Sequence, residues 1–246
     1  METTATTRPQ PQSPAAAPRH DLYARVHKGL RVFMGDTLAA VGRMDPADAD
    51  DVAAALGQLR LLLELCQSHL EHENRFLHAA MEARRPGSAA RTDEDHVGHE
   101  EAIDELTAEI GAVERATGAA RTAAAHRLYL RLAAFVAENL AHMHVEETAN
   151  NAVLWACYTD DELLAIEHML VAAIPPQKMG AFLRWMLPSM SHAERVAMLS
   201  GMRQGAPAEV FAGVLGLTRA HVPARDWAKL AAALDVAAAP HIAVPA

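Results

Sequence analysis

The chain has 246 residues, of which 51% are hydrophobic and 22% charged, and its formal net charge is −9. The negative charge argues against a surface for nucleic acid or anionic membranes, and two cysteines, Cys66 and Cys157, cannot form a disulfide framework. No apolar run approaches the roughly 18 residues that a membrane-spanning helix requires. We therefore expect a soluble, cytoplasmic protein, built either as one domain with an extension or as two domains.

The composition favours an all-α protein with a metal site. Aromatic residues make up only 4% of the chain, alanine is abundant and β-branched residues are few, which is typical of helical proteins. Histidine occurs 14 times and is clustered, whereas cysteine is scarce. This imbalance indicates a metal site made of nitrogen and oxygen ligands.

Four long helices are predicted in the first two thirds of the chain. Residues 1–18, rich in Pro, Thr and Ala, predict a disordered tail. Apolar residues then recur at helical spacing over residues 20–43, 46–83, 89–116 and 119–155, and the capping box Thr159–Glu162 opens a shorter helix that ends near residue 174. The short connections predict an up-down-up-down four-helix bundle within residues 19–174.

A shorter-helix extension is predicted to follow Pro175-Pro176, over residues 175–236, with a tail at 237–246. Its helices span residues 178–187, 191–203, 206–221 and 223–234, and Ser191 and Glu194 form a second capping box. The extension is rich in methionine: Met179, Met186, Met190, Met198 and Met202. We interpret these side chains as core, with a surface for a protein partner or a second copy of the chain as the alternative.

The second and fourth predicted helices carry the same motif, His-x-x-x-Glu, at His69–Glu73 and His142–Glu146. Residues four apart lie one turn apart on the same helix face, so each His and Glu point the same way. Both motifs lie on apolar stripes, where a carboxylate is costly unless it is paired or bound to a metal. The repeat therefore predicts two metal ions bridged by the two carboxylates.

The other two helices offer single histidines to the same interior. His27 lies on the apolar stripe of the first helix, and His96 and His99 lie one turn apart on the third. The separations His27–His69 and His99–His142 are 42 and 43 positions, typical of a duplicated αα-hairpin, and slightly favour His99 over His96. The flanking histidines fall off the inward stripe and are expected to be solvated: His72, His78, His126 and His144.

Competing metal motifs are missing from the sequence. No Glu is followed by His three residues on, as in ferritin-like di-iron bundles, and there is no His-Glu-x-x-His and no Cys-x-x-Cys. The residues named above, over about residues 20–160, resemble the hemerythrin-like proteins with the HHE cation-binding domain. That resemblance implies a four-helix bundle with a non-haem di-iron centre that binds dioxygen, nitric oxide or related small species.

The motif on the last helix of the predicted bundle distinguishes branches of this family. Animal oxygen carriers of this family have His-x-x-x-x-Asp on the last helix, whereas Glu146 here stands four residues after His142. The motif looks more like that of the bacterial iron-centre-repair and iron-sensing branches.

These observations give a functional expectation. A His/carboxylate cage for two ions favours iron over zinc, which normally takes four ligands, and six or seven protein ligands leave an open position. We therefore expect a protein with two iron ions that binds or senses O₂, NO or peroxide. The alternative is a di-iron oxidoreductase (an oxygenase, a peroxidase or an iron-centre repair protein). A third reading is an iron-dependent switch that presents its C-terminal helices to a partner.

Overall fold

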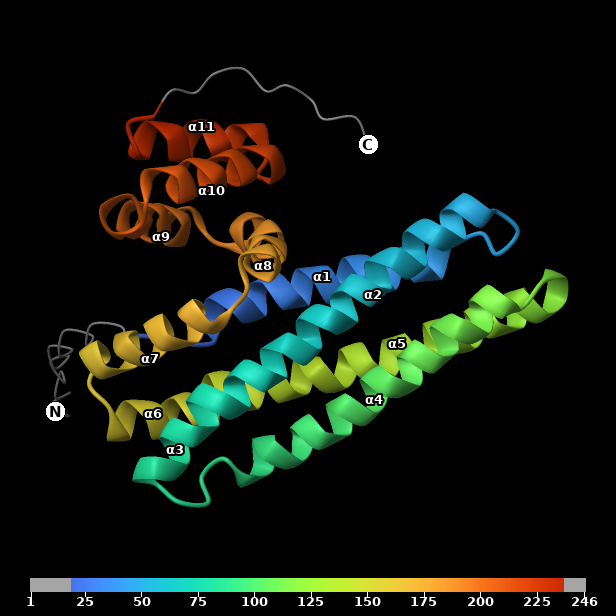
Figure 1. The fold of residues 1–246 in the computed structure, drawn as a ribbon, viewed down its shortest axis with the longest axis horizontal. Coiled ribbons are helices and arrows are strands. Elements are labelled where there is room, and N and C mark those ends of the chain that lie inside the picture. Colours follow the sequence, from blue (N-terminus) through green and yellow to red (C-terminus); the bar gives the residue numbers. More distant parts are fainter. Residues whose placement is uncertain (1–18, 237–246) are drawn as a thin grey trace, which may run out of the picture.

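The computed structural model describes residues 19–236, and the two predicted tails, 1–18 and 237–246, lie outside this range. Within it, the secondary structure is helical throughout, which confirms the predicted all-α class (Figure 1). No helix among these residues is both long enough and apolar enough to cross a membrane.

The long helices α1 (Ala24–Arg43), α2 (Ala49–His72), α4 (Ala90–Arg115) and α5 (Gly118–Val145) lie side by side (Figure 1). Helix α1 packs on α2 and α5, and α4 packs on α5 and α2. The boundary of α2 differs from the predicted one at Asp45-Pro46. Its N-cap is Asp48, whose carboxylate accepts hydrogen bonds from the backbone N–H groups of Asp50 and Asp51, because these are the first free donors of the helix.

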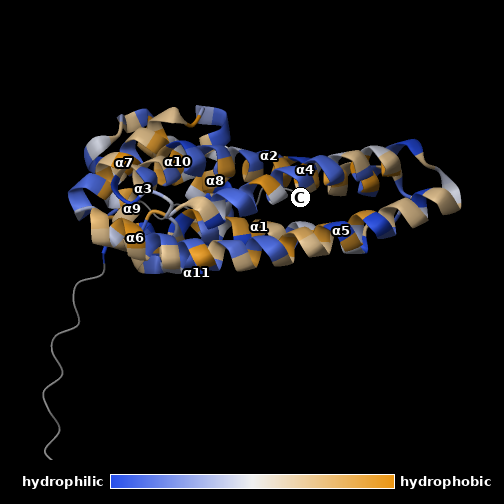
Figure 2. Ribbon diagram, turned by 90° about the horizontal axis from the view of Figure 1, so that it is seen from below, coloured by the Kyte–Doolittle hydropathy of each residue, from blue (hydrophilic) through white to orange (hydrophobic). Residues whose placement is uncertain are grey.

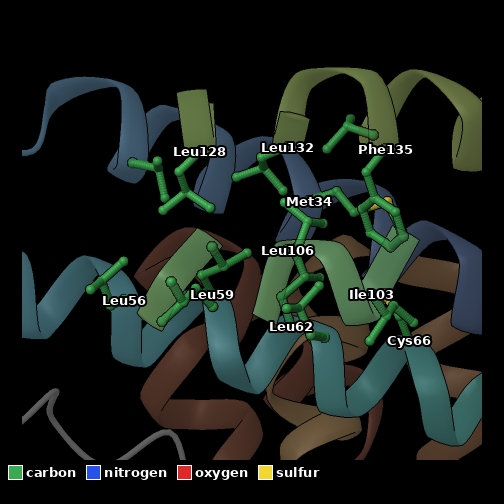
Figure 3. Close-up of a cluster of buried hydrophobic side chains, with 14 of the residues drawn as sticks. Met34, Leu56, Leu59, Leu62, Cys66, Ile103, Leu106, Leu128, Leu132 and Phe135 are labelled. Atoms are coloured by element: carbon green, nitrogen blue, oxygen red, sulfur yellow. The ribbon is translucent and has the colours of Figure 1, made fainter. Parts of the chain in front are cut away.

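Hydrophobic and hydrophilic residues alternate around each long helix (Figure 2), and the apolar stripes meet in one core. Figure 3 shows side chains from four helices pointing toward one another in this core: Met34, Leu56, Leu59, Leu62, Cys66, Ile103, Leu106, Leu128, Leu132 and Phe135. Cys66 is a buried member of it, and burial raises the pKa of its thiol to about 12. This core holds together the part of the bundle beyond the histidines.

Two of the predicted helices are interrupted. The segment predicted at 46–83 contains a π-helical turn, η1 (Glu73–His78), followed by α3 (Ala79–Arg84). The segment predicted at 119–155 contains a second one, η2 (Glu146–Asn150), followed by α6 (Asn151–Cys157). Helix α7 (Asp160–Ala173) then begins with the predicted Thr159–Glu162 capping box, which is confirmed.

The extension consists of α8 (Pro176–Ser189), α9 (His192–Gly205), α10 (Ala208–His221) and α11 (Ala224–Ala233), as predicted, and the Ser191–Glu194 capping box is confirmed. It has its own apolar cluster, against which Met179, Met198 and Met202 pack. Met190 is buried, so the interpretation of these methionines as core holds. Helix α8 packs on α1, with the rings of Phe33 and Trp185 stacked at 4.0 Å.

Candidate metal centre

Six of the predicted ligands meet at one place in the bundle, as two groups that share both carboxylates. The first group is His27, His69, Glu73 and Glu146, and the second is Glu73, His96, His142 and Glu146. Within each group one ligand atom per residue lies within 4.8 Å of all the others. The donors come from four elements that are far apart in sequence: α1, the α2–η1 junction, α4 and the α5–η2 junction.

The first pair of histidines is His27 and His69, whose Nε2 atoms are 3.1 Å apart. The Nε2 of His27 lies 3.5 Å from Oε1 of Glu73 and 3.4 Å from Oε2 of Glu146. The Nε2 of His69 lies 3.2 Å from the same oxygen of Glu73. Each imidazole therefore presents the same ring nitrogen to the shared carboxylates.

The second pair, His96 and His142, repeats this arrangement, with Nε2 atoms 3.0 Å apart. His96 lies 3.6 Å from Oε2 of Glu73 and 3.6 Å from Oε1 of Glu146, and His142 lies 3.3 Å from Oε2 of Glu146. Glu73 thus turns one oxygen toward each pair. This is the placement that a carboxylate bridging two ions requires.

The donor set fits metal binding better than it fits hydrogen bonding. All four carboxylate oxygens of Glu73 and Glu146 are buried and have no hydrogen-bond partner among the described residues. A buried carboxylate without partners is costly, and a cation removes that cost. Two donors about 2.1 Å from one ion and at right angles lie about 3.0 Å apart, which is close to the separations of the Nε2 atoms within each pair.

The ionisation of the two carboxylates reflects their crowding. Burial, and then the charge of Glu146, raise the pKa of Glu73, because two carboxylates in one dry site disfavour each other's charge. Burial acts in the same direction on Glu146, but contacts with His142 and His96 outweigh it and hold its pKa well below the usual range. The pair therefore carries negative charge in a site that excludes water.

The histidines of the first pair titrate in opposite directions. Burial alone would lower the pKa of His27, but contacts with Glu147 and Glu73 raise it to about 9. Burial, together with the charge of His27, lowers the pKa of His69 well below its ordinary value. His69 is therefore neutral at neutral pH, and a neutral imidazole is the form that binds a metal.

Hydrogen bonds to Nδ1 orient three of the four rings. The Nδ1 of His27 lies 3.1 Å from Oε1 of Glu147, and the Nδ1 of His96 lies 2.6 Å from Oδ1 of Asn74. The Nδ1 of His142 lies 3.3 Å from Oδ2 of Asp95. An acceptor at Nδ1 holds a proton there, so Nε2 is the nitrogen that a metal would bind, in exchange for any proton it carries.

Glu147 in turn is fixed from the other side. Two hydrogen bonds, of 2.6 and 3.0 Å, run to its carboxylate from the guanidinium of Arg31, one turn after His27 on α1. Burial opposes its ionisation, but His27 and Arg31 lower the pKa of Glu147 to about 2. A salt bridge therefore holds the outer partner of His27 in place.

Each π-helical turn begins at a bridging glutamate. The backbone N–H of Glu73 donates to both His69 and Leu70, and that of Glu146 donates to both His142 and Met143. A π-turn adds a residue to the helical turn and re-aims the side chains that follow, and such turns are frequent at functional sites. Sequence reasoning missed both turns, because it assumed an α-helical period through residues 46–83 and 119–155.

Of the two histidines on α4, His96 and His99, only His96 lies close to the bridging carboxylates. His96 belongs to the second group, whereas His99 belongs to neither. The ring of His99 lies 4.8 Å from that of His142 and 6.2 Å from that of Phe135, and its buried Nδ1 has no partner among the described residues. The loop lengths slightly favoured His99, and the structure instead brings His96 to the carboxylates.

The expectation that His78 is solvated is wrong. His78 is buried, its ring stacks on that of His96 at 4.7 Å, and its Nδ1 bonds Asp93 on α4. The reason is the π-turn, which brings the fifth residue after Glu73 back toward the ligand face. His126 and His144 are exposed as expected, and His72 is half-buried.

Sequence reasoning also missed Tyr23. This residue directly precedes α1, is fully buried, and its ring lies 5.4 Å from that of His27. A residue at a helix start belongs to no apolar period, so the pattern gave it no weight. Its burial beside a candidate ligand is the signal that the structure supplies.

Comparison with known proteins gives no further assignment: no family model, no curated protein and no solved structure matches this chain. The helical fold and the buried His/Glu cluster therefore carry the functional argument.

Proposed function

We propose that this protein binds two metal ions at the carboxylates of Glu73 and Glu146, one ion with each histidine pair. The observation that carries the proposal is the set of four buried carboxylate oxygens without hydrogen-bond partners among the described residues, placed between two pairs of Nε2 atoms. Hydrogen bonds alone leave these oxygens unsatisfied. A shared dinuclear site satisfies all four.

We further propose that the ions are iron and that residues 19–174 form a hemerythrin-like up-down-up-down bundle. Imidazole and carboxylate ligands suit iron, and zinc with its preference for four tetrahedral ligands fits a shared six-residue cage less well. The resemblance in sequence to HHE-domain proteins supports the same metal and topology. We place the protein in the cytoplasm, because its cysteines form no disulfide framework.

The proposed activity is binding or sensing of O₂, NO or peroxide. A bound iron pair supplies reversible electron transfer and an open coordination position for a small ligand. The chain orients the imidazoles through Glu147, Asn74 and Asp95, and excludes water from the carboxylates by burying them. Six protein donors do not saturate two ions that each prefer six ligands.

A binding role is favoured over the alternative, a di-iron oxidoreductase acting on a larger substrate. A cavity of about 700 Å³ lies between α1 and α5 and is lined by residues such as Val41, Met44, Ala125 and Tyr129. None of its lining residues belongs to the cage. The lining residues of α1 begin eight positions after His27, which places them about 12 Å further along the helix.

Anaerobic titration of the metal-free protein with Fe²⁺ tests the proposal. Metal analysis after desalting should give about two ions per chain, and air and NO should each change the ultraviolet–visible spectrum of the reduced protein. Binding without turnover in the presence of a reductant supports the sensor or carrier role, whereas catalytic consumption of peroxide or oxygen supports the oxidoreductase. Retention of no metal by the wild-type chain would remove the proposal.

A further inference from the structure

Tyr23 lies beside the metal centre, where hydrogen bonds hold its backbone and apolar side chains pack around its ring. Its N–H donates to Oδ1 of Asp21 at 2.9 Å, and its carbonyl accepts the first helical hydrogen bond, from the N–H of His27, at 3.0 Å. The ring packs in an apolar cluster with Leu77 and Leu154, which follow the two bridging glutamates in the chain.

The hydroxyl of Tyr23 is a donor without an acceptor. It is buried and makes no hydrogen bond to any of the described residues. Burial, and then the charges of Glu146 and Glu73, raise its pKa well above the ordinary value, so the phenol keeps its proton. The hydroxyl therefore lies within the field of both bridging carboxylates but beyond hydrogen-bonding distance from them.

Its polar neighbour is Asn150, whose side chain lowers the pKa of the phenol by less than burial and the two carboxylates raise it. The Nδ2 of Asn150, on η2, donates to Oγ1 of Thr92 at 3.2 Å, and the hydroxyl of Thr92 donates to the carbonyl of Ala89 at 3.1 Å. Tyr158, in the same apolar cluster, shows the usual arrangement, because its hydroxyl donates to the carbonyl of Ala80 at 2.7 Å. Buried donors without partners are rare in native proteins and call for an explanation.

We propose that the hydroxyl of Tyr23 donates a hydrogen bond to a small exogenous ligand bound at the metal pair. This inference rests on the dinuclear site proposed above. It adds which side of that site the ligand occupies and what chemical groups the ligand must carry. The ligand must carry a strong acceptor, as small anions and reduced diatomic species do. A fixed donor in a dry site favours negative charge on such an atom, since the low local dielectric strengthens the bond.

The opposite end of the site also has buried ring nitrogens without partners among the described residues, Nε2 of His78 and Nδ1 of His99, but a neutral imidazole nitrogen donates in only one of its two tautomers, whereas a phenol always can. The rings of His78 and His99 lie against those of His96 and His142 at 4.7 and 4.8 Å. They fill the space behind the second pair with imidazole. Beside the first pair, the unpartnered hydroxyl of Tyr23 lies near both bridging carboxylates. For that reason we assign the ligand to the side of the site that Tyr23 faces.

The test uses the iron-loaded, oxidised full-length chain and azide as the probe. Azide affinity is measured by spectrophotometric titration for the wild type, Tyr23→Phe and the control Tyr158→Phe. A hydrogen bond to a charged acceptor corresponds to a tenfold to hundredfold change in affinity, so Tyr23→Phe should weaken azide binding by about that factor. Tyr158→Phe removes a half-buried hydroxyl that has its own acceptor, and should stay within about twofold of the wild type.

Infrared spectra and metal analysis make the outcome specific. The antisymmetric stretch of bound azide should shift in D₂O for the wild type and lose that shift in Tyr23→Phe, with about two ions per chain in both proteins. Equal azide affinity in wild type and Tyr23→Phe at equal metal content overturns the inference while leaving the metal site intact. An intense visible band that disappears in Tyr23→Phe also overturns it, by showing the phenolate on iron. A wild-type chain that takes up no iron refutes the proposed function itself.

Discussion

The two histidine pairs meet the same carboxylates with nearly equal spacing, but their surroundings differ. The Nε2 atoms are 3.1 Å apart in the first pair and 3.0 Å apart in the second. Behind the first pair stand a salt-bridged carboxylate, Glu147, and a free phenol, Tyr23. Behind the second stand two further imidazoles, those of His78 and His99. A repeated motif thus sets where donor atoms lie, while non-repeated neighbours set how each half behaves.

Removing a shared carboxylate should abolish metal binding at both histidine pairs, because both pairs depend on it. Glu73→Gln replaces an anion that faces both pairs with a neutral amide, which cannot bridge two ions. We expect iron content to fall from about two ions per chain to well below one, and Glu146→Gln should do the same. Glu138→Gln, an exposed change on α5, is the control. Metal analysis after dialysis measures the result, and two retained ions in either site variant would contradict the bridging role.

Substitutions on α4 should have the next largest effect. His96→Ala removes a donor from the second pair and should lose at least one ion per chain, since no other imidazole in its group can replace it. His99→Ala leaves all six donors in place and should keep about two. Equal loss from both variants would show that His99 is also a ligand, as the loop lengths suggested.

The sequence predicted those parts of the site that depend on local geometry. His69 with Glu73, and His142 with Glu146, are four apart on a helix, and this spacing alone directs them to one face. Both capping boxes were predicted for the same reason, because their hydrogen bonds span three residues.

Tertiary geometry decided the features that the sequence could not specify. The choice between His96 and His99 depends on how far α4 is shifted along its neighbours, which residue spacing does not encode. His78 was misplaced because an α-helical period was assumed through a π-turn. Tyr23 precedes α1 and therefore lies outside any periodic pattern.

Substitution of the residues that bond Nδ1 of the ligand histidines should show how far the two pairs differ. Glu147→Gln breaks the salt bridge from Arg31 and weakens the acceptor at Nδ1 of His27, so metal affinity should fall about 10- to 100-fold. Asp95→Asn changes a half-exposed carboxylate at 3.3 Å from His142, and the effect should be smaller. Competition with a chelator measures both affinities. A larger effect of Asp95→Asn would contradict the expectation that Glu147 supports metal binding more strongly than Asp95.

The smallest expected effect is the pH dependence of stability in the metal-free protein, where two single histidines, His99 and His27, should act at opposite ends of the pH range. Burial, and then repulsion from His142 and His96, lower the pKa of His99 to about 4. The unfolded chain, with a histidine pKa of about 6.5, therefore takes up a proton that the folded chain refuses. Stability is lost as the pH falls below 6.5. The pKa of His27 is instead raised to about 9, so its contribution is present below pH 6.5 and is lost as the pH rises through 9.

Urea unfolding of chelator-treated protein across the pH range separates these two contributions. Between pH 7.5 and 6 the contribution of His99 to the free energy of unfolding should fall by about 1 kcal/mol, and His99→Gln should remove that part of the acid dependence. His27→Gln should flatten the alkaline side, and because the charge of His27 helps to lower the pKa of His69, it should also weaken the acid dependence that His69 contributes. Because each variant is compared with the wild type at every pH, an absolute loss of stability from the substitution does not affect the slope. The same slope in all three proteins would show that neither His99 nor His27 has the shifted pKa on which this prediction rests.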